Sequence, residues 1–453
     1  MKPRAHPDPR RGSLALVAMA FSAVIAITLA GYVGLSYQSY QHSERMLQRE
    51  RARRLAETGL EEALWSLNNG DWSNATWTVT GSNISCTLSG LALGEGATGS
   101  IAITITNYTS TTAPSIQSVG TVALAAGGQL TRTLNATAKP APLFCNAIGI
   151  ANTYNGTVWF NGGATVDSWN SNPSGDNATF VAYSPPGSYT AAANCAAVVA
   201  APNLALNAVV YGYAETFGNN FTSFAGTKVK GPTTAAAINI DQSRVSKSAF
   251  VPLFPVAVPS SYTVTGTLDG SSQTIGTANG ATEYWSSPSD LVLNGTTLTV
   301  QGPTVIIVHG NFQMYGGGRI QVNATGNARV EIFSSGDVSI GITPHGSSVW
   351  LNNLSNQPRN LVIYSTSTNT SRLFNYYTSH NFCGLMYSAA NAQIVFDTGV
   401  TTDFTGAICS NYDVLVSGIT TLDLHYDTYL RNIAKGWFKG ITTPFMLVQV
   451  TES

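Results

Sequence analysis

Residues 11–37 read RGSLALVAMAFSAVIAITLAGYVGLSY, and this stretch decides the architecture of the N-terminal part of the chain. From Ser13 to Tyr37 it carries no charged side chain. A helix of that length would span roughly 37 Å, enough to cross a hydrocarbon core of about 30 Å. Because four basic residues precede it, the positive-inside rule keeps residues 1–12 in the cytoplasm and exports the rest. The four are Lys2, Arg4, Arg10 and Arg11.

The helical pattern continues beyond the apolar run. Leu60, Leu64 and Leu67 fall on one helical face, and the sequence NNG at residues 68–70 supplies a helix stop. We therefore expect one helix of about 55 residues, half in the membrane and half outside. A cleaved secretory signal would have a shorter apolar stretch, followed by a small-x-small site. A plain signal anchor with a juxtamembrane helix is the simpler alternative.

Two further segments carry a resemblance to a known family. They are RGSLALV at residues 11–17 and RLAETGLEEAL at residues 54–64. With the apolar run between them, they resemble the N-terminal region of PilX-type minor pilins. That family has an Arg-Gly leader end and an Ala-Glu-x-Gly-Leu-Glu-x-Ala block at this distance. The match covers residues 10–70.

The resemblance implies how the chain is processed and where it resides. A prepilin peptidase would cut after Gly12, and Ser13 would become an N-methylated N-terminus. Glycine suits such a site, because a side chain would obstruct close approach of the enzyme to the backbone. The implied partners are this peptidase, other pilin subunits, the pilus assembly machinery and the inner membrane, which the helix crosses once.

The chain departs from major pilins at the fifth mature position, where Val17 stands instead of glutamate. In that family the glutamate is thought to neutralise the amino terminus of a neighbouring subunit inside the filament core. An unpaired charge buried there is costly, and Val17 cannot supply the pairing. A minor or tip position therefore fits this chain better than the bulk of a filament. A pilin-like membrane protein outside any filament fits as well.

The composition indicates an exported, β-rich protein. The chain has 453 residues and a formal net charge of −1, and only 10% of its residues are charged. Soluble domains average about 25%, so Ser, Thr, Asn and Gly must cover much of the surface. Because the positive and negative charges nearly cancel, the chain has no long-range electrostatic field that would attract nucleic acid. Nucleic acid is therefore not an expected partner. A hydrophobic fraction of 43% argues against disorder.

The body after the helix of residues 13–70 has a different periodicity. The hydrophobic period changes from about 3.6 to about 2 residues, which predicts strands. Residues 71–142 are expected to form a small antiparallel β-domain packed on the exposed half of the helix. Residues 143–261 form a first β-rich section ending in a Pro-rich strap. Residues 262–447 form a C-terminal section of short strands.

The C-terminal section contains an internal echo. FCGLMYS at residues 382–388 matches FTGAICS at residues 404–410, a spacing of 22 residues. Short strands repeating at this interval predict stacked coils, a right-handed β-solenoid-like body with echoing residues in register. An ordinary β-sandwich is the alternative, with strands about every 8–12 residues and no echo.

Residues 290–432 also resemble β-helical domains of unknown function that follow PilX-type N-termini. The resemblance rests on GLMYSAANA at residues 384–392, FTGAI at residues 404–408 and LHYDTYL at residues 424–430. It implies an architecture and no activity. The residues expected to close the end of the solenoid are His425, Tyr426 and Asp427.

The five cysteines show no zinc-site spacing, and no metal site is predicted. An exported protein can form disulfides. Cys383 and Cys409 would be offset by about four residues, roughly 13 Å of strand. That separation is too large for a bridge. Cys145 and Cys195 are the better candidate pair.

Signals for chemistry are few. The aspartates of the C-terminal section stand alone, as turn residues do, and none forms the Asp-Asp or Asp-x-Asp cluster that the two carboxylates of glycoside hydrolysis would suggest. They are Asp337, Asp397, Asp403, Asp413, Asp423 and Asp427. No cofactor is predicted, and the protein is not expected to be an enzyme. Tyr376 and Tyr377, in a polar loop, are the best candidates for an exposed face that binds a surface or a carbohydrate.

The sequence therefore predicts a type IV pilus-like minor pilin or pseudopilin, a structural or adhesive subunit at or near a filament tip. Its N-terminus would be cytoplasmic and its body periplasmic or extracellular, in a diderm bacterium. One alternative is an inner-membrane-anchored β-helical surface protein outside any pilus. Another is a β-helical polysaccharide-active enzyme, which converging carboxylates in a groove would favour.

Overall fold

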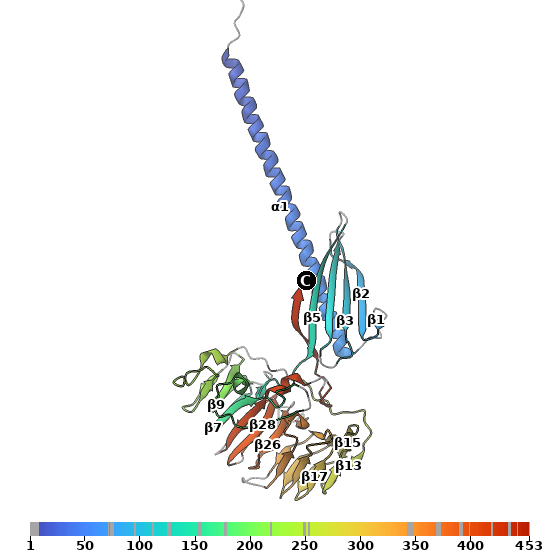
Figure 1. Ribbon diagram of the computed structural model, residues 1–453, viewed down its shortest axis with the longest axis vertical. Helices are drawn as coiled ribbons and strands as arrows, with labels where there is room; N and C mark the ends of the chain where they lie inside the picture. The colour runs from blue at the N-terminus through green and yellow to red at the C-terminus, as the bar shows by residue number, and fades with distance from the viewer. Residues whose placement is uncertain are drawn as a thin grey trace, which may run out of the picture. The chain divides into compact units, whose positions relative to one another are not determined.

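The computed structural model describes most of the chain and divides it into two compact units. Unit 1 is Met1–Lys139 with Phe445–Ser453, and unit 2 is Pro140–Pro444. The fold is mostly β, with one long N-terminal helix (Figure 1). Outside the described part are residues 1–8, 71, 73–76, 95–96, 111–112, 125–127, 152–155, 176–178, 218–219, 248–250, 252–253, 342–347, 368–372, 389–392, 398, 418–419, 434–435, 442 and 453, and the side chains of residues 9–15, 161 and 373.

Some sequence predictions therefore concern parts of the chain that are not described. Most of the expected leader lies in residues 1–8, and for Gly12 and Ser13 only the helical backbone is described. The same holds for residues 389–392, which carry part of the resemblance to β-helical domains.

Helix α1 spans Pro9–Asn69. Its apolar stretch is exposed from residue 16 on, and by length and composition it is the one helix among the described residues that could cross a membrane. The predicted helix stop is confirmed. After the last helical residue, Gly70 adopts a φ of +64°, and its N–H donates to the Ser66 carbonyl at 2.9 Å.

The C-terminal half of α1 packs on an antiparallel sheet (Figure 1). In sheet order the strands are β1 (Trp77–Thr80), β2 (Asn83–Ala92), β3 (Thr98–Thr106), β4 (Ser115–Ala123), β5 (Gln129–Pro140) and β31 (Phe445–Glu452). A stripe of small residues on α1 faces the sheet and is buried: Ala52, Ala56, Gly59 and Ala63. This stripe gives a physical reason for the Ala and Gly of the block at residues 54–64, because small side chains let the helix approach the strands closely.

The last strand of the sheet comes from the C-terminus of the chain. Asn68 on α1 accepts a hydrogen bond from the Phe445 N–H and donates one to the Phe445 carbonyl. Phe445 is itself buried among the helix and sheet residues. Residues 445–447 were expected in the C-terminal section, whereas in the structure they belong to unit 1. The pairing depends on contacts across most of the chain, which no local pattern reveals.

Unit 2 is built from parallel ladders of short strands. The first runs through β13 (Gly266–Thr267), β15 (Glu283–Ser287), β18 (Pro303–Val308), β21 (Arg329–Ser334), β24 (Leu361–Ser365), β26 (Phe382–Ser388) and β28 (Thr401–Ser410). The second runs through β16 (Leu291–Asn294), β19 (Phe312–Tyr315), β22 (Val338–Ile340), β25 (Leu373–Tyr376), β27 (Gln393–Phe396) and β29 (Val414–Val416). The third runs through β14 (Gln273–Ile275), β17 (Thr297–Val300), β20 (Arg319–Val322) and β23 (Trp350–Asn353).

Strands from the first half of unit 2 extend these ladders. They are β6 (Ile148–Ile150), β7 (Thr157–Trp169), β8 (Ala197–Ala201) and β9 (Asn203–Thr216), with β10 (Phe221–Ser223), β11 (Lys228–Lys230) and β12 (Val245–Ser246) pairing to β9. Strand β28 pairs with β6, and β30 (Thr421–Asp427) pairs with β28 on one side and β7 on the other. In Figure 1 the orange and red strands of the C-terminal part, β28 among them, accordingly belong to the same body as the green β7.

This arrangement corrects the prediction for His425, Tyr426 and Asp427. They do not close an end, because β30 lies inside the ladder between β28 and β7. The Tyr426 hydroxyl donates to the Phe144 carbonyl at 2.8 Å. Asp427 accepts hydrogen bonds from the N–H and hydroxyl of Ser171. The block therefore joins the two sections of unit 2.

The predicted register of the echo is confirmed. Cys383 pairs with Thr405, and Tyr387 pairs with Cys409. From β18 to β6 one in-register column is aliphatic, and these members are fully buried: Ile306, Ile332, Ile363, Met386, Ile408 and Ile148. Burial of each such side chain stabilises the fold by about 1.5–3 kcal/mol.

The Pro-rich strap predicted before residue 262 contains no strand after Ser246 and before Gly266 among the described residues. It is fixed to the ladder instead. The Tyr387 hydroxyl donates to the Phe254 carbonyl at 2.6 Å and accepts from the Phe254 N–H at 2.8 Å. The Ala257 N–H donates to the Gly440 carbonyl at 2.8 Å.

Candidate functional site

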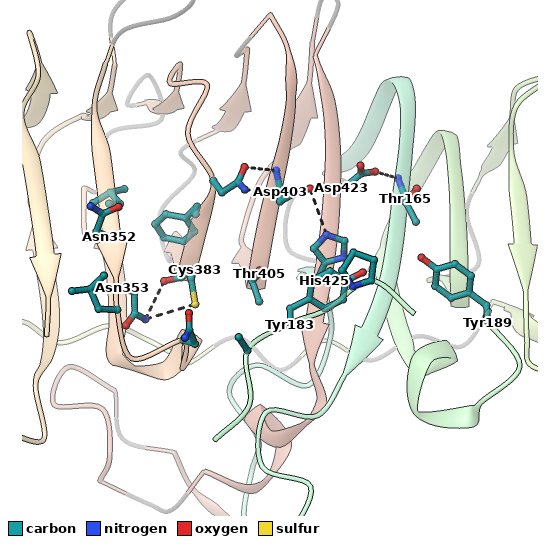
Figure 2. Close-up of a pocket in the computed structure, with 17 residues that line it drawn as sticks. Thr165, Tyr183, Tyr189, Asn352, Asn353, Cys383, Asp403, Thr405, Asp423 and His425 are labelled. Atoms are coloured by element: carbon teal, nitrogen blue, oxygen red, sulfur yellow. Dashed lines mark hydrogen bonds and ion pairs between the residues drawn. The ribbon is translucent and has the colours of Figure 1, made fainter. Parts of the chain in front are cut away.

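A polar groove of about 610 Å³ lies over β26, β28, β30 and β7 (Figure 2). Two rows of in-register residues cross these strands. The first row contains Asp403 and Asp423, with Asn381 beside Asp403 and Thr165 beside Asp423. The second row contains Cys383, Thr405, His425 and Asp167. In-register neighbours on adjacent strands are about 4.8 Å apart, so each row presents its side chains close together.

Asp167 is the buried centre of this region, with no exposed surface. Its Oδ2 accepts hydrogen bonds from the hydroxyls of Tyr183 at 2.8 Å and Tyr189 at 3.0 Å. Its Oδ1 lies 2.8 Å from Nδ1 of His425. Burial and the Asp167 carboxylate raise the pKa of both tyrosines well above the ordinary value. Both hydroxyls therefore stay protonated and donate.

The tyrosines attach the segment before η1 (Ala192–Cys195) to the strands. The ring of Tyr183 stacks on the His425 imidazole with centroids 3.7 Å apart. The ring of Tyr189 stacks on that of Tyr211 at 3.5 Å. Together with their bonds to Asp167, these contacts form one wall of the groove.

His425 is held so that one ring nitrogen remains for a ligand. An ionised carboxylate only accepts hydrogen bonds, so the contact with Asp167 assigns the proton to Nδ1 of the neutral ring. Nε2 then carries the lone pair. Its nearest acidic neighbour is Oδ1 of Asp403 at 3.7 Å, beyond hydrogen-bond distance. The side chain is only 6% exposed.

Asp403 exchanges hydrogen bonds with the Asn381 side chain, whereas the Asp423 carboxylate caps a backbone N–H on the neighbouring strand. The Asp403 N–H donates to Asn381 Oδ1 at 3.2 Å, and Asn381 Nδ2 donates to Asp403 Oδ2 at 3.0 Å. Asp423 Oδ1 accepts from the Thr165 N–H at 2.7 Å. The second oxygen of Asp423 makes no hydrogen bond to the part of the chain that the structure describes.

Aspartate side chains away from the groove also cap backbone N–H groups by accepting hydrogen bonds from them. Asp413 Oδ1 accepts from the Thr157 N–H at 2.7 Å, and Asp290 Oδ1 accepts from the Asn311 N–H at 2.7 Å. Capping is thus a general role of aspartate in these ladders. Asp423 combines it with a position in the groove, where Asp403 and His425 also lie.

The prediction of an exposed tyrosine face is wrong for Tyr376. This residue ends β25, where Tyr376 and Phe374 both point inward and are fully buried. The Tyr376 hydroxyl donates to the His380 carbonyl at 2.6 Å. Tyr377 is half-buried. The alternation of a short strand, rather than a polar loop, sets these orientations.

The predicted bridge between Cys145 and Cys195 is also absent, because all five cysteines are free thiols. Cys195 Sγ donates to the Tyr189 carbonyl at 3.3 Å. Burial raises the pKa of both thiols. Among the described residues, no group of three or more His, Cys, Asp or Glu side chains could hold a metal ion.

The groove was not predicted, because its residues are distant in the chain. Asp167 and His425 are 258 positions apart, and Tyr183 and Tyr189 belong to no sequence motif that points to a site. The available signal was the echo. Asn381, Asp403 and Asp423 follow one another at intervals close to the repeat of the coils.

A family model described as a domain of unknown function (DUF7305) matches residues 257–433. The matched part includes Asp403, Asp423 and His425, whereas Asp167 and the two tyrosines lie outside it. No curated protein and no solved structure matches the chain. The second half of unit 2 is therefore similar to a domain family of unknown function.

Proposed function

We propose that the protein is a PilX-like minor pilin or pseudopilin, a structural or adhesive subunit at or near a filament tip. The observation that carries this is the form of unit 1. The apolar half of α1 is uncovered, and its other half packs on an antiparallel sheet through Ala52, Ala56, Gly59 and Ala63. A helix of this kind can insert among the helices of neighbouring subunits while the sheet remains outside the membrane.

In this proposal the body is a β-solenoid. The parallel ladders of unit 2 support it, since each strand of a ladder pairs in register with the strand of the next coil. Right-handed coils are expected, because parallel β crossovers are almost always right-handed. The solenoid would be displayed outside the inner membrane by the helix.

Val17 supports a minor position in such a filament. Its side chain is 54% exposed and apolar, so it suits a lipid or helix surface and cannot neutralise a partner's amino terminus. A subunit with this residue fits a tip, where no partner amine follows. In the alternative, a membrane-anchored β-helical surface protein, the same helix anchors the chain but no peptidase removes residues 1–12.

Processing of the full chain by a prepilin peptidase tests the proposal. Co-expression with the peptidase is expected to remove residues 1–12, and a Gly12→Leu variant is expected to remain uncut. Gly31→Leu is the matched control, because a side chain at Gly31 meets nothing within 4 Å and the residue lies in the apolar run that follows the cleavage site. Intact-mass measurement distinguishes the products. A wild-type chain that keeps its first 12 residues would contradict the proposal.

A second candidate function is a polysaccharide-active enzyme. It is favoured by the neighbouring carboxylates of Asp403 and Asp423 beside His425, since glycoside hydrolysis uses two carboxylates flanking the scissile bond. Release of reducing ends from a panel of polysaccharides, lost in both Asp403→Asn and Asp423→Asn, would establish it. Absence of release across the panel would remove it.

A further inference from the structure

The groove of unit 2 combines hydrogen-bond acceptors with an absence of positive charge. Asp403 and Asp423 lie on neighbouring strands, and neither lysine nor arginine occurs among the described residues that line the groove. We infer that the groove binds a neutral oligosaccharide, whose hydroxyls donate to Asp403, Asp423 and His425. This inference names a ligand for the adhesive role proposed above and rests on that role for its biological meaning.

The acceptors suit hydroxyl donors. One carboxylate oxygen of Asp423 accepts no hydrogen bond from the described residues, and the Asp403 side chain is 49% exposed. Hydrogen bonds from hydroxyls to a carboxylate are about twice as strong as those between neutral groups. The same two charges would repel uronic acids, sulfated sugars and phosphates, and the described lining of the groove has no lysine or arginine to attract them. The preference is therefore for glycans without acidic groups.

His425 is the second, independent observation. Its side chain is 6% exposed, and Nε2, which makes no hydrogen bond within the described part of the chain, faces Asp403 Oδ1 at 3.7 Å across the groove (Figure 2). The bond to Asp167 and the stacked Tyr183 ring fix the imidazole in this orientation. A ligand hydroxyl would satisfy Nε2.

The surroundings favour a sugar over a peptide or a metal ion. Strands β28 and β30 are paired on both sides, so the groove offers no free strand edge to a peptide. No described cluster of side chains provides three metal ligands. The volume of about 610 Å³ falls in the range of small-ligand sites. Asn352 on the opposite side adds an amide that both donates and accepts, as sugar hydroxyls do.

Binding of immobilised oligosaccharides to the full chain in detergent micelles tests the inference. The probes are neutral hexose oligomers, uronic-acid oligomers and sulfated oligomers. The wild type is expected to bind a neutral class and neither acidic class. Asp403→Asn and Asp423→Asn are each expected to weaken binding about tenfold or more, because each removes a charge-assisted hydrogen bond.

Asp413→Asn is the matched control. Asp413 caps the Thr157 N–H as Asp423 caps the Thr165 N–H, at the same 2.7 Å, but lies outside the groove. Its variant is expected to bind as the wild type does. The inference is overturned if the wild type binds no neutral oligomer, or if Asp413→Asn weakens binding as much as Asp423→Asn. A chain that is processed after Gly12 but binds no sugar refutes only the groove, whereas a chain that binds sugar but is not processed refutes only the pilin proposal.

Discussion

Replacing Gly120 with valine is expected to destabilise unit 1 by about 3 kcal/mol or more, at the upper end of overpacking effects. Gly120 lies on β4 directly under α1. A Cβ at this position would collide with the Ala52 carbonyl oxygen and lie 2.6 Å from the Ala56 nitrogen. These are helix backbone atoms, so no side chain can rotate away, and the helix must lift from the sheet.

Hydrogen exchange followed by mass spectrometry measures this effect for each unit separately. In Gly120→Val, protection is expected to fall in residues 52–67 and in β3 and β4, while unit 2 keeps its protection. Gly163→Val is the control, because Gly163 also lies in a strand and a side chain there meets nothing within 4 Å. Unchanged protection of α1 in Gly120→Val would show that the helix does not pack on the sheet as described.

The second large effect is a pH dependence from Glu331. Burial raises the pKa of this carboxyl to about 7, although the Lys439 N–H, Arg329 and the Tyr364 hydroxyl oppose the rise. The side chain is 4% exposed and accepts hydrogen bonds from the Lys439 N–H and the Tyr364 hydroxyl. The ionised form is therefore costly in the folded state.

The sign follows from proton binding. Between the unfolded value of 4.5 and about 7, the folded state holds a proton that the unfolded chain has lost, so the free energy of unfolding falls as pH rises. In total, the free energy of unfolding falls by about 3 kcal/mol between pH 4 and pH 8. Glu331→Gln cannot ionise and is expected to lose this part of the dependence. Relative to the wild type, it should gain about 3 kcal/mol as the pH is raised from 4 to 8.

Denaturant unfolding of unit 2 at several pH values provides the measurement. The difference between variant and wild type isolates the ionisation from the cost of substituting the side chain. Glu61→Gln, on the exposed face of α1, is the control and should leave the pH profile unchanged. Parallel profiles for Glu331→Gln and the wild type would contradict the assignment of a buried carboxyl with a raised pKa.

Local patterns were sufficient for some of the fold. The uncharged run from Ser13 to Tyr37 and the leucines at 60, 64 and 67 predict α1, because one helical period accounts for both. The 22-residue echo predicts the pairing of Cys383 with Thr405, because equivalent residues of successive coils come into register. Both predictions rest on residues close in the chain.

Local patterns could not predict the contacts between segments that are distant in the chain. Strand β7 pairs with β30, and this brings Asp167 to His425 across 258 residues. Because of this pairing, the block predicted to close the solenoid lies inside the ladder, and the groove forms beside it. Tyr376 was assigned to a loop because its strand is short and polar residues surround it, although its ring is fully buried. In each case packing between segments outweighed the local sequence.

In the proposed function, the chain is a processed subunit of a surface filament. This is tested by the N-terminal peptide of the protein recovered from filaments sheared off the native cells, identified by mass spectrometry. We expect a peptide that begins at methylated Ser13 in the sheared fraction. Chains that begin at Met1 and occur only in the membrane fraction would contradict it.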